Sequence, residues 1–183
     1  MRIRKPVVLI GMMGCGKSTI GRLLAGQMGL PLIDLDEEIA RAAGRSIPEI
    51  FAAEGDAGFR IHETAALGRA LGAGAAVIAT GGGIVTRAEN IELMREKGVV
   101  VWLCRPLEDM IADVRQDTRP NLAGDKEERM RTLYAQRVHL YEAAAHLQFD
   151  NRLPLRESAK ALEKAISAAC GDSSSKGEDE KKR

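Results

Sequence analysis

Short apolar runs alternate with longer segments of helical length along most of the chain. The runs are rich in β-branched residues, as buried strands are, and the segments between them are long enough for helices. This alternation predicts βαβ units, and therefore an α/β fold with a parallel sheet and helices on both faces. Ligands of such sheets bind beyond the carboxyl ends of the strands, so motifs that follow strands are candidates for chemistry. The predicted strands cover residues 6–10, 32–33, 76–80, 99–104 and 147–149.

Two expected helix starts carry capping patterns. Ser46 is followed by Pro48 and Glu49, which predicts a capping box in which the Ser and Glu side chains bond to backbone N–H groups of the first turn. Thr86, with Glu89 three residues later, predicts a second capping box. We therefore expect helices to begin at both positions.

The length of 183 residues suits one α/β domain with a substantial core, whereas two independent domains would be cramped. Residues 171–183 are polar, balanced in charge and without apolar anchors, which favours a disordered tail. We predict one domain over residues 1–170, followed by this tail.

Charge and cysteine content narrow the class of protein. With 27 basic and 26 acidic residues, the formal net charge of +1 gives no electrostatic case for nucleic acid or an anionic membrane as partner. No apolar run approaches the length of a membrane span, and the N-terminus lacks the apolar region of a signal peptide. Cys15, Cys104 and Cys170 are scattered and odd in number, so neither a disulfide framework nor a zinc site is indicated. A soluble protein of the reducing cytoplasm fits these features best.

The first predicted strand is followed by GMMGCGKST, which matches the phosphate-loop pattern G-x-x-x-x-G-K-[ST]. In such a loop, backbone N–H groups and the positive end of the next helix surround a nucleotide phosphate. Lys17 would reach the β- and γ-phosphates, and the Ser18 hydroxyl would bind Mg²⁺. The alternative is a glycine-rich turn that binds nothing, which the strand before the loop and the helix after it make less favourable. The residues expected to bind ATP here are Gly14, Cys15, Gly16, Lys17, Ser18 and Thr19.

Two carboxylates follow the second predicted strand. Asp34 and Asp36 are two residues apart, so in an extended segment both would face the same cleft. One would act near Mg²⁺ through its waters, and the other would accept a hydrogen bond from the hydroxyl that is phosphorylated. The alternative, that Asp36 only caps a helix over residues 37–43, is nearly as well supported by spacing alone.

The third predicted strand ends in Gly81, Gly82 and Gly83, which would let backbone N–H groups meet a ligand without intervening side chains. A flexible turn is the alternative. The chain shows no apolar strand followed by the Asn-Lys-x-Asp motif with which GTPases read guanine, so a GTPase is disfavoured.

Three arginines are further candidates. Arg60 lies beside Phe59 in a predicted helix, and its planar guanidinium suits a carboxylate, although an exposed helix arginine is the default. Residues 115–125 contain Pro, Asn and Gly and are predicted to form a loop, from which Arg119 could close over ATP. A solvated basic connector is the alternative. Arg137 lies late in a long helix expected to begin near Asp125, and periodicity does not decide whether it faces the cleft.

This ordered set of motifs resembles the shikimate kinases, to about residue 155. The resemblance rests on the phosphate loop, on Asp34-x-Asp36, on Phe59-Arg60 with Glu63, and on the glycine turn. It also rests on Arg119-Pro120-x-Leu122 and on Arg137-x-x-x-Tyr141. Any one motif is modest evidence, whereas the set in this order is highly specific.

The resemblance implies a phosphate-loop kinase fold like that of the nucleoside monophosphate kinases, with five parallel strands in the order 2-3-1-4-5. It implies that Lys17 and Ser18 serve ATP and Mg²⁺, with Asp34 supporting the metal through water. Shikimate would be held by Asp36, Arg60, Gly82 and Arg137, with the two arginines on its carboxylate. Arg119 would belong to a lid at about residues 115–125 and contact the ATP phosphates.

The chain departs from the family pattern at three positions. Cys15 stands where the family often has Ser or Ala, and its thiol beside Lys17 at a helix start is a candidate for oxidation. Asn121 and His139 replace a frequent Leu and a frequent Pro. Beyond Asp150 the match thins, and Arg152 is the residue expected beside adenine there.

The sequence therefore predicts a monomeric kinase that transfers the ATP γ-phosphoryl group to the 3-hydroxyl of shikimate. Asp36, Lys17 and Arg119 are the predicted catalytic residues. One alternative is a related kinase for gluconate or a nucleoside monophosphate, which the paired arginines disfavour because they suit a carboxylate. Another is a nucleotide-binding regulatory module without catalysis, although nothing that the chemistry needs is visibly missing.

Overall fold

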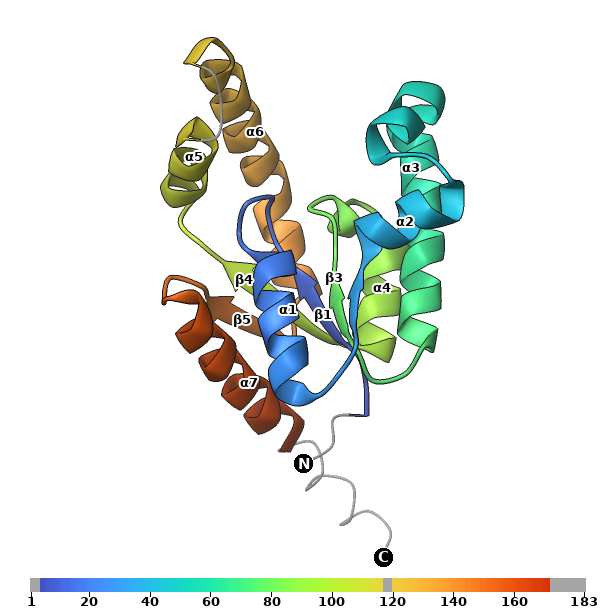
Figure 1. The fold of residues 1–183 in the computed structure, drawn as a ribbon, viewed down its shortest axis with the longest axis vertical. Helices are drawn as coiled ribbons and strands as arrows, with labels where there is room; N and C mark the ends of the chain where they lie inside the picture. The colour runs from blue at the N-terminus through green and yellow to red at the C-terminus, as the bar shows by residue number, and fades with distance from the viewer. Residues whose placement is uncertain (1–3, 117–119, 172–183) are drawn as a thin grey trace, which may run out of the picture.

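A five-stranded parallel sheet forms the centre of the molecule, with the strand order β2-β3-β1-β4-β5 (Figure 1). The computed structural model describes the backbone of residues 4–116 and 120–171 and the side chains of residues 4–113 and 126–170. The predicted strands and their order are confirmed, with ends that shift by one residue or less. The strands are β1 (Val7–Ile10), β2 (Leu32–Asp34), β3 (Val77–Ala79), β4 (Val99–Cys104) and β5 (Leu147–Asp150).

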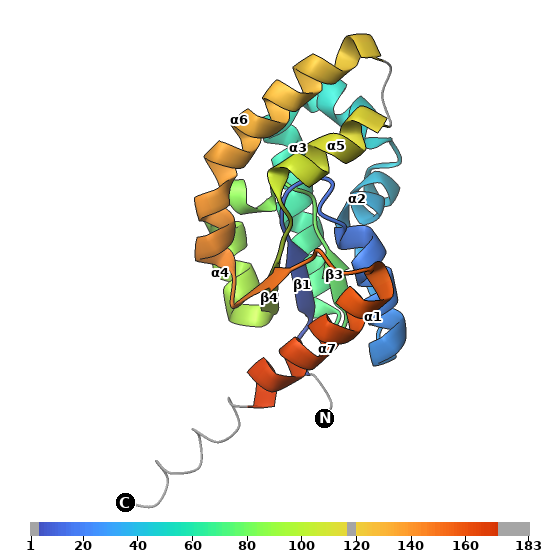
Figure 2. The same cartoon turned by 90° about the vertical axis from the view of Figure 1, so that its left-hand side faces the viewer.

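Helices cover both faces of this sheet, as the alternation predicts. One face carries α1 (Lys17–Met28) and α7 (Leu155–Gly171), and the other carries α4 (Ala88–Lys97) and α6 (Pro120–Ala144) (Figure 2). No helix among the described residues is long and apolar enough to cross a membrane. The remaining helices are α2 (Leu35–Ala43), α3 (Ile47–Gly72), α5 (Leu107–Gln116) and the short 3-10 helix η1 (Ile84–Thr86).

The core lies on both sides of β1, whose four residues are all fully buried. A strand covered on both faces has no solvent side, which explains why it is continuously apolar rather than alternating. Each large apolar side chain that is buried contributes about 1.5–3 kcal/mol. Two aromatic rings, Trp102 of β4 and Tyr141 of α6, stack with their centroids 6.0 Å apart. This contact fixes α6 against the sheet near the end of β4.

The capping box at Ser46 is confirmed and begins α3. The Glu49 N–H donates to Ser46 Oγ at 3.4 Å, and the Ser46 N–H donates to Glu49 Oε2 at 2.7 Å. The long helix then bends at Gly55, whose φ of 68° lies in the left-handed region that favours glycine. The bend separates the first part of α3 from the part that carries Arg60.

The second predicted capping box is wrong. Thr86 ends η1, and its hydroxyl donates to the Gly83 carbonyl at 2.7 Å, so it does not accept from the next helix. Helix α4 begins at Ala88, and its N-cap is Arg87, which makes no side-chain cap. A threonine hydroxyl serves a turn as readily as a cap, and here the tight turn after the glycines takes it.

The predicted loop over residues 115–125 is also too long. Helix α5 continues to Gln116, and α6 begins at Pro120, so residues 120–125 are helical. Proline suits the first position of a helix because its missing N–H would be unsatisfied there in any case. The long helix therefore starts five residues before the expected position near Asp125.

Candidate functional site

The phosphate loop connects β1 to α1 at the carboxyl edge of the sheet. Gly11, Gly14 and Gly16 have φ angles of 142°, 79° and 95°, so a side chain at any of them would be strained. Gly16 is also the N-cap of α1. A Cβ atom at Gly11 would lie 2.8 Å from the Leu103 carbonyl oxygen. The three glycines are therefore required by the shape of the loop itself, beyond general flexibility.

Lys17 crosses back over this loop. Its Nζ donates to the carbonyl oxygens of Gly11 and Met12, each at 2.8 Å, and the residue is only 8% exposed. A buried ammonium needs such partners, because burying a charge without them is costly. The positive charge is thus held inside the loop, where the phosphates of a nucleotide would lie.

Cys15 does not have the exposure that oxidation would require. The residue is 1% exposed, and its Sγ is 3.7 Å from Lys17 Nζ. Burial restricts access of oxidants and thiol reagents to the sulfur. The oxidation hypothesis is therefore disfavoured by this structure, although the predicted proximity to Lys17 is correct.

Ser18 and Asp34 bring two side-chain oxygen atoms together beside the loop. Ser18 Oγ donates to Asp34 Oδ2 at 2.7 Å. Mg²⁺ binds oxygen ligands, keeps several waters and usually relies on substrate phosphates, so this pair fits the ion. No group of three His, Cys, Asp or Glu residues within the described part of the chain would hold a metal by itself. The chemistry of the pair therefore suits magnesium that arrives with a nucleotide.

The helix cap at this point is Asp34 rather than Asp36. The Asp36 N–H donates to Asp34 Oδ1 at 3.1 Å, and α2 already begins at Leu35. The alternative role for Asp36, as the cap of a helix over residues 37–43, is therefore wrong. Its carboxylate is free of that task and stands in the first turn of α2, where the positive end of the helix favours a negative charge.

The electrostatic neighbours of Asp36 come from two parts of the site. Although Asp36 keeps solvent-exposed surface, desolvation by the surrounding protein and then the charge of Asp34 raise its pKa above 3.8. The charges of Lys17 and Arg60 act in the opposite direction. Asp36 thus lies within electrostatic reach of the phosphate loop on one side and of Arg60 on the other. A raised pKa makes a carboxylate a better proton acceptor near neutral pH.

Arg60 is not an exposed helix arginine, because its side chain is only 12% exposed. Nη1 donates to Glu63 Oε2 at 2.8 Å, and Nη2 donates to Asp56 Oδ1 at 3.0 Å. The guanidinium lies directly against Gly83, where any Cβ atom would overlap it. Glycine at position 83 therefore leaves the space that the Arg60 guanidinium occupies.

Glu63 is a residue to which the sequence analysis gave no role. It is fully buried, and burial raises its pKa, although the hydrogen bond and charge of Arg60 oppose the shift. Its second oxygen, Oε1, has no hydrogen-bond partner and lies 3.0 Å from the position of a Cβ atom at Gly81. Its spacing of three residues from Arg60 on a helix was the available signal.

Tyr141 links the glycine turn to Arg137. Its hydroxyl donates to the Gly82 carbonyl at 2.5 Å. Burial raises the pKa of Tyr141 to about 12, while the charge of Arg137 and a hydrogen bond with it act in the opposite direction. Arg137 is half-buried on α6, one turn before Tyr141. Asp36 Oδ1 lies 3.3 Å from where a Cβ atom at Gly81 would stand, so the predicted substrate residues Asp36, Arg60, Gly82 and Arg137 all lie at or near this turn. Arg119 lies outside the described residues.

Two further residues reach the phosphate loop from the neighbouring strands. Asn151, just after β5, donates from Nδ2 to the Cys15 carbonyl at 2.8 Å. Arg105, just after β4, donates from Nη1 to the Gly14 carbonyl at 3.2 Å. Neither residue was predicted from the sequence, although each follows a predicted strand whose end lies at the same edge of the sheet.

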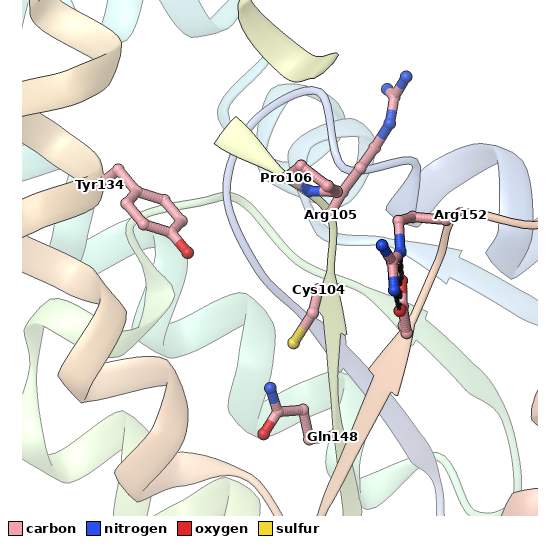
Figure 3. Close-up of a pocket in the computed structure, with 7 residues that line it drawn as sticks. Cys104, Arg105, Pro106, Tyr134, Gln148 and Arg152 are labelled. Atoms are coloured by element: carbon pink, nitrogen blue, oxygen red, sulfur yellow. Dashed lines mark hydrogen bonds and ion pairs between the residues drawn. The ribbon is translucent and has the colours of Figure 1, made fainter. Parts of the chain in front are cut away.

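An open cavity of about 470 Å³ lies beside this edge, between α6 and the ends of β4 and β5 (Figure 3). Arg152 bonds to both carboxylate oxygens of Asp150 here, from Nε at 2.8 Å. Burial raises the pKa of the Cys104 thiol to about 11, which favours the protonated thiol at neutral pH. Arg152 as a neighbour of adenine stays a prediction. The cavity is lined by Cys104, Arg105, Pro106, Tyr134, Gln148, Asp150 and Arg152.

The family model described as shikimate kinase matches residues 13–167, which includes every site residue named above except Gly11 and Met12. The chain belongs to the shikimate kinase family. It is 44% identical over 146 residues to shikimate kinase of Symbiobacterium thermophilum, covering 78% of this chain and 84% of that protein. It is 46% identical over 143 residues to shikimate kinase of Chromohalobacter salexigens, covering 77% and 79%.

Solved structures agree with this family assignment. Shikimate kinase from Acinetobacter baumannii, in complex with shikimate, has a TM-score of 0.83 and 36% identity, covering 91% of this chain and 95% of that chain. A gluconokinase from Sinorhizobium meliloti has a TM-score of 0.60 at 17% identity, covering 95% of this chain and 99% of that chain, which shows a shared fold alone. The chain is thus an ATP-dependent kinase of the shikimate kinase family with the predicted phosphate-loop fold.

Proposed function

We propose that this enzyme transfers the γ-phosphoryl group of ATP to the 3-hydroxyl of shikimate, giving shikimate 3-phosphate and ADP for aromatic amino acid (chorismate) biosynthesis. The observation that carries the proposal is the position of Asp36 within electrostatic reach of both Lys17 and Arg60. A hydroxyl bonded to Asp36 would lie between a loop built for phosphate and an arginine suited to a carboxylate. Shikimate has both the hydroxyl and the carboxylate that this arrangement requires.

The phosphate loop would hold ATP through its backbone N–H groups and the start of α1, with Gly14 to Thr19 around the phosphates. Lys17 would exchange its bonds to two loop carbonyls for bonds to the β- and γ-phosphates. Ser18, with Asp34 acting through a water, would hold Mg²⁺. That ion, when bound, neutralises charge on the phosphate oxygens.

The acceptor would be held at two ends. Arg60 and Arg137 would bind its carboxylate, while Asp36 and the backbone of Gly82 would bind its ring hydroxyls. Glu63 holds one edge of the Arg60 guanidinium in place, through Nη1, whereas Asp56, whose side chain is 70% exposed, can give way to the incoming carboxylate. Positioning of this kind supplies much of the acceleration in phosphoryl transfer, because the protein does little covalent chemistry.

Asp36 would orient the 3-hydroxyl and accept its proton as the new P–O bond forms and ADP leaves. Its raised pKa supports this role, since the carboxylate is a stronger base than an ordinary aspartate. Arg119 would complete the site from a lid and stabilise charge on the transferring phosphoryl group. We further propose that the enzyme is a cytoplasmic monomer, in keeping with the free cysteines of the described residues.

The test is release of ADP from Mg-ATP with shikimate, with gluconate, with a nucleoside monophosphate and without acceptor. The proposal expects release with shikimate only. Release with another acceptor alone would keep the nucleotide site and overturn the roles of Arg60 and Arg137. ATP binding without release under any condition would instead favour a regulatory module.

A further inference from the structure

Two successive carbonyl groups of the phosphate loop are held from outside, by side chains that follow β5 and β4. Asn151 Nδ2 donates to the Cys15 oxygen at 2.8 Å, and Arg105 Nη1 donates to the Gly14 oxygen at 3.2 Å. Neither residue belongs to the motifs on which the family resemblance rests. Both contacts join segments that are far apart in the chain, so they tie the loop to the sheet.

The position of Asn151 is itself fixed by the sheet. Its N–H donates to the Cys104 carbonyl at 2.8 Å, which continues the β4–β5 ladder one residue beyond Asp150. The residue is 8% exposed, and its Nδ2 lies 3.0 Å from where a Cβ atom at Gly16 would stand. The amide is therefore enclosed between the sheet and the loop, and it has little freedom to leave the Cys15 carbonyl.

This contact determines which way one peptide group of the loop faces. The peptide plane between Cys15 and Gly16 holds its C=O and N–H in opposite directions. Because Asn151 holds the Cys15 C=O, the Gly16 N–H of the same peptide group is directed away from Asn151. Lys17 bonds to two other carbonyls of the loop, those of Gly11 and Met12. Side chains thus bond to four carbonyl groups of the loop, those of Gly11, Met12, Gly14 and Cys15.

The side-chain oxygen of Asn151 indicates that Nδ2, the donor, is the atom for which an asparagine is needed here. Oδ1 is buried and has no hydrogen-bond partner in the structure. Burying an unpartnered oxygen is unfavourable, and an apolar residue of similar size would avoid it. The N–H group that reaches Cys15 is therefore the interaction that accounts for an asparagine at this position.

We propose that Asn151 is a positioning residue that holds the phosphate loop in its ATP-binding conformation, with Arg105 as the second outer contact. Arg105 also bonds to Asp113, so the same guanidinium joins the loop to α5. The inference rests on the nucleotide site of the proposed function. A loop held in this way avoids losing affinity to conformations that cannot bind ATP.

The test measures the Kd of Mg-ATP by calorimetry for two variants. Asn151→Asp keeps the shape but places an acceptor against the Cys15 carbonyl, and Asn151→Leu keeps the volume without adding charge. Loss of this buried hydrogen bond is expected to raise the Kd and the KM for ATP by about tenfold in both variants. The KM for shikimate is expected to stay within about twofold, because the acceptor residues are not touched.

Asn90 provides a matched control. It is fully buried, donates from Nδ2 to the Ile84 carbonyl at 3.1 Å, and also has an unpartnered Oδ1. Asn90→Asp and Asn90→Leu are expected to lower the melting temperature in the same way without changing the Kd of Mg-ATP. If Asn151 had only a structural role, its variants would behave like the Asn90 variants, with a lower melting temperature and an unchanged Kd of Mg-ATP.

The inference is overturned if the folded Asn151 variants bind Mg-ATP as the wild type does, or if the Asn90 variants weaken binding equally. Failure of the wild type to bind Mg-ATP would overturn the proposed function instead. If neither Asn151 variant folds, the Kd of Mg-ATP is measured for Arg105→Ala, with Arg41→Ala, which changes an exposed arginine of α2, as the control. The Kd is expected to rise by about threefold for Arg105→Ala and to stay unchanged for Arg41→Ala. Equal Kd values for the two variants would overturn the proposal that the outer contacts hold the loop.

Discussion

Removal of the Glu63 carboxylate should destabilise the enzyme and weaken its acceptor site together. Glu63 is fully buried and forms an ion pair with Arg60, whose side chain is only 12% exposed. The distance between Arg60 Nη1 and Glu63 Oε2 is 2.8 Å. Removing one member of a buried ion pair costs about 3–5 kcal/mol, because the other charge stays desolvated. The remaining partner, Asp56, is 70% exposed, and pairs of that kind contribute about 0–1 kcal/mol.

We therefore expect Glu63→Ala to lower the free energy of unfolding by about 3 kcal/mol, toward the lower end of that range. For a chain of this length, such a loss corresponds to a fall of about 6–12 °C in the melting temperature. The KM for shikimate should rise by about tenfold, because Arg60 loses the contact that holds its plane, while the KM for ATP stays unchanged. Thermal unfolding by circular dichroism and steady-state kinetics measure these quantities.

Two variants control this prediction. Asp56→Ala removes the exposed partner of Arg60 and should change the free energy of unfolding by less than about 1 kcal/mol. The double variant Arg60→Leu and Glu63→Leu should regain most of the stability that Glu63→Ala loses, since apolar pairs replace buried ion pairs at little cost. Unlike Glu63→Ala, it should be inactive, because it lacks the arginine proposed to bind the carboxylate of shikimate. A melting temperature of Glu63→Ala within about 2 °C of the wild type would refute the reasoning.

Three further predictions concern the chemistry. Asp36→Asn should leave the Kd of Mg-ATP nearly unchanged in calorimetry and lower kcat by about 10²–10⁴-fold, and retained turnover would contradict its role. Lys17→Met should raise the Kd of Mg-ATP and lower kcat. A fall in kcat alone would show that the lysine does not bind the nucleotide in the ground state. Because Asp36 must be ionised to accept a proton and its pKa is raised above 3.8, kcat/KM should fall as the pH drops through a value above that of an ordinary aspartate. A pH profile that stays flat down to pH 4 would argue against this.

The parts of the fold that the sequence predicted are those that local chemistry decides. The apolar strands, the capping box at Ser46 and the glycines of the phosphate loop each follow from a few neighbouring residues. Arg60 in a helix was predicted for the same reason, but its burial was not. That burial depends on the space left by Gly83, which is distant in sequence and adjacent in the fold.

The wrong helix start at Thr86 and the alternative left open at Asp36 both arose where one side chain has two local uses. Asp34 and Asp36 could both cap α2, and only the folded backbone shows that Asp34 accepts the Asp36 N–H. Thr86 could cap a helix or close a turn, and the geometry after Gly83 selects the turn. Hydroxyl and carboxylate groups bond to nearby backbone in several ways of similar energy, so spacing cannot choose between them.

The long-range contacts were beyond any local pattern. Asn151 reaches the phosphate loop only because β5 runs parallel to β4 with Asp150 opposite Cys104. That register is a property of the whole sheet, and the motif match thinned at this part of the chain. Asparagine after a strand has many uses, so its donor role required the structure.

The most direct test of the account is the identity of the product. The enzyme is incubated with Mg-ATP and shikimate, and the mixture is analysed by mass spectrometry and ³¹P NMR. The account predicts one molecule of shikimate 3-phosphate for each molecule of ADP. Formation of ADP without phosphorylated shikimate, or phosphorylation at a different hydroxyl, would contradict the placement of the acceptor between Asp36, Arg60 and Arg137.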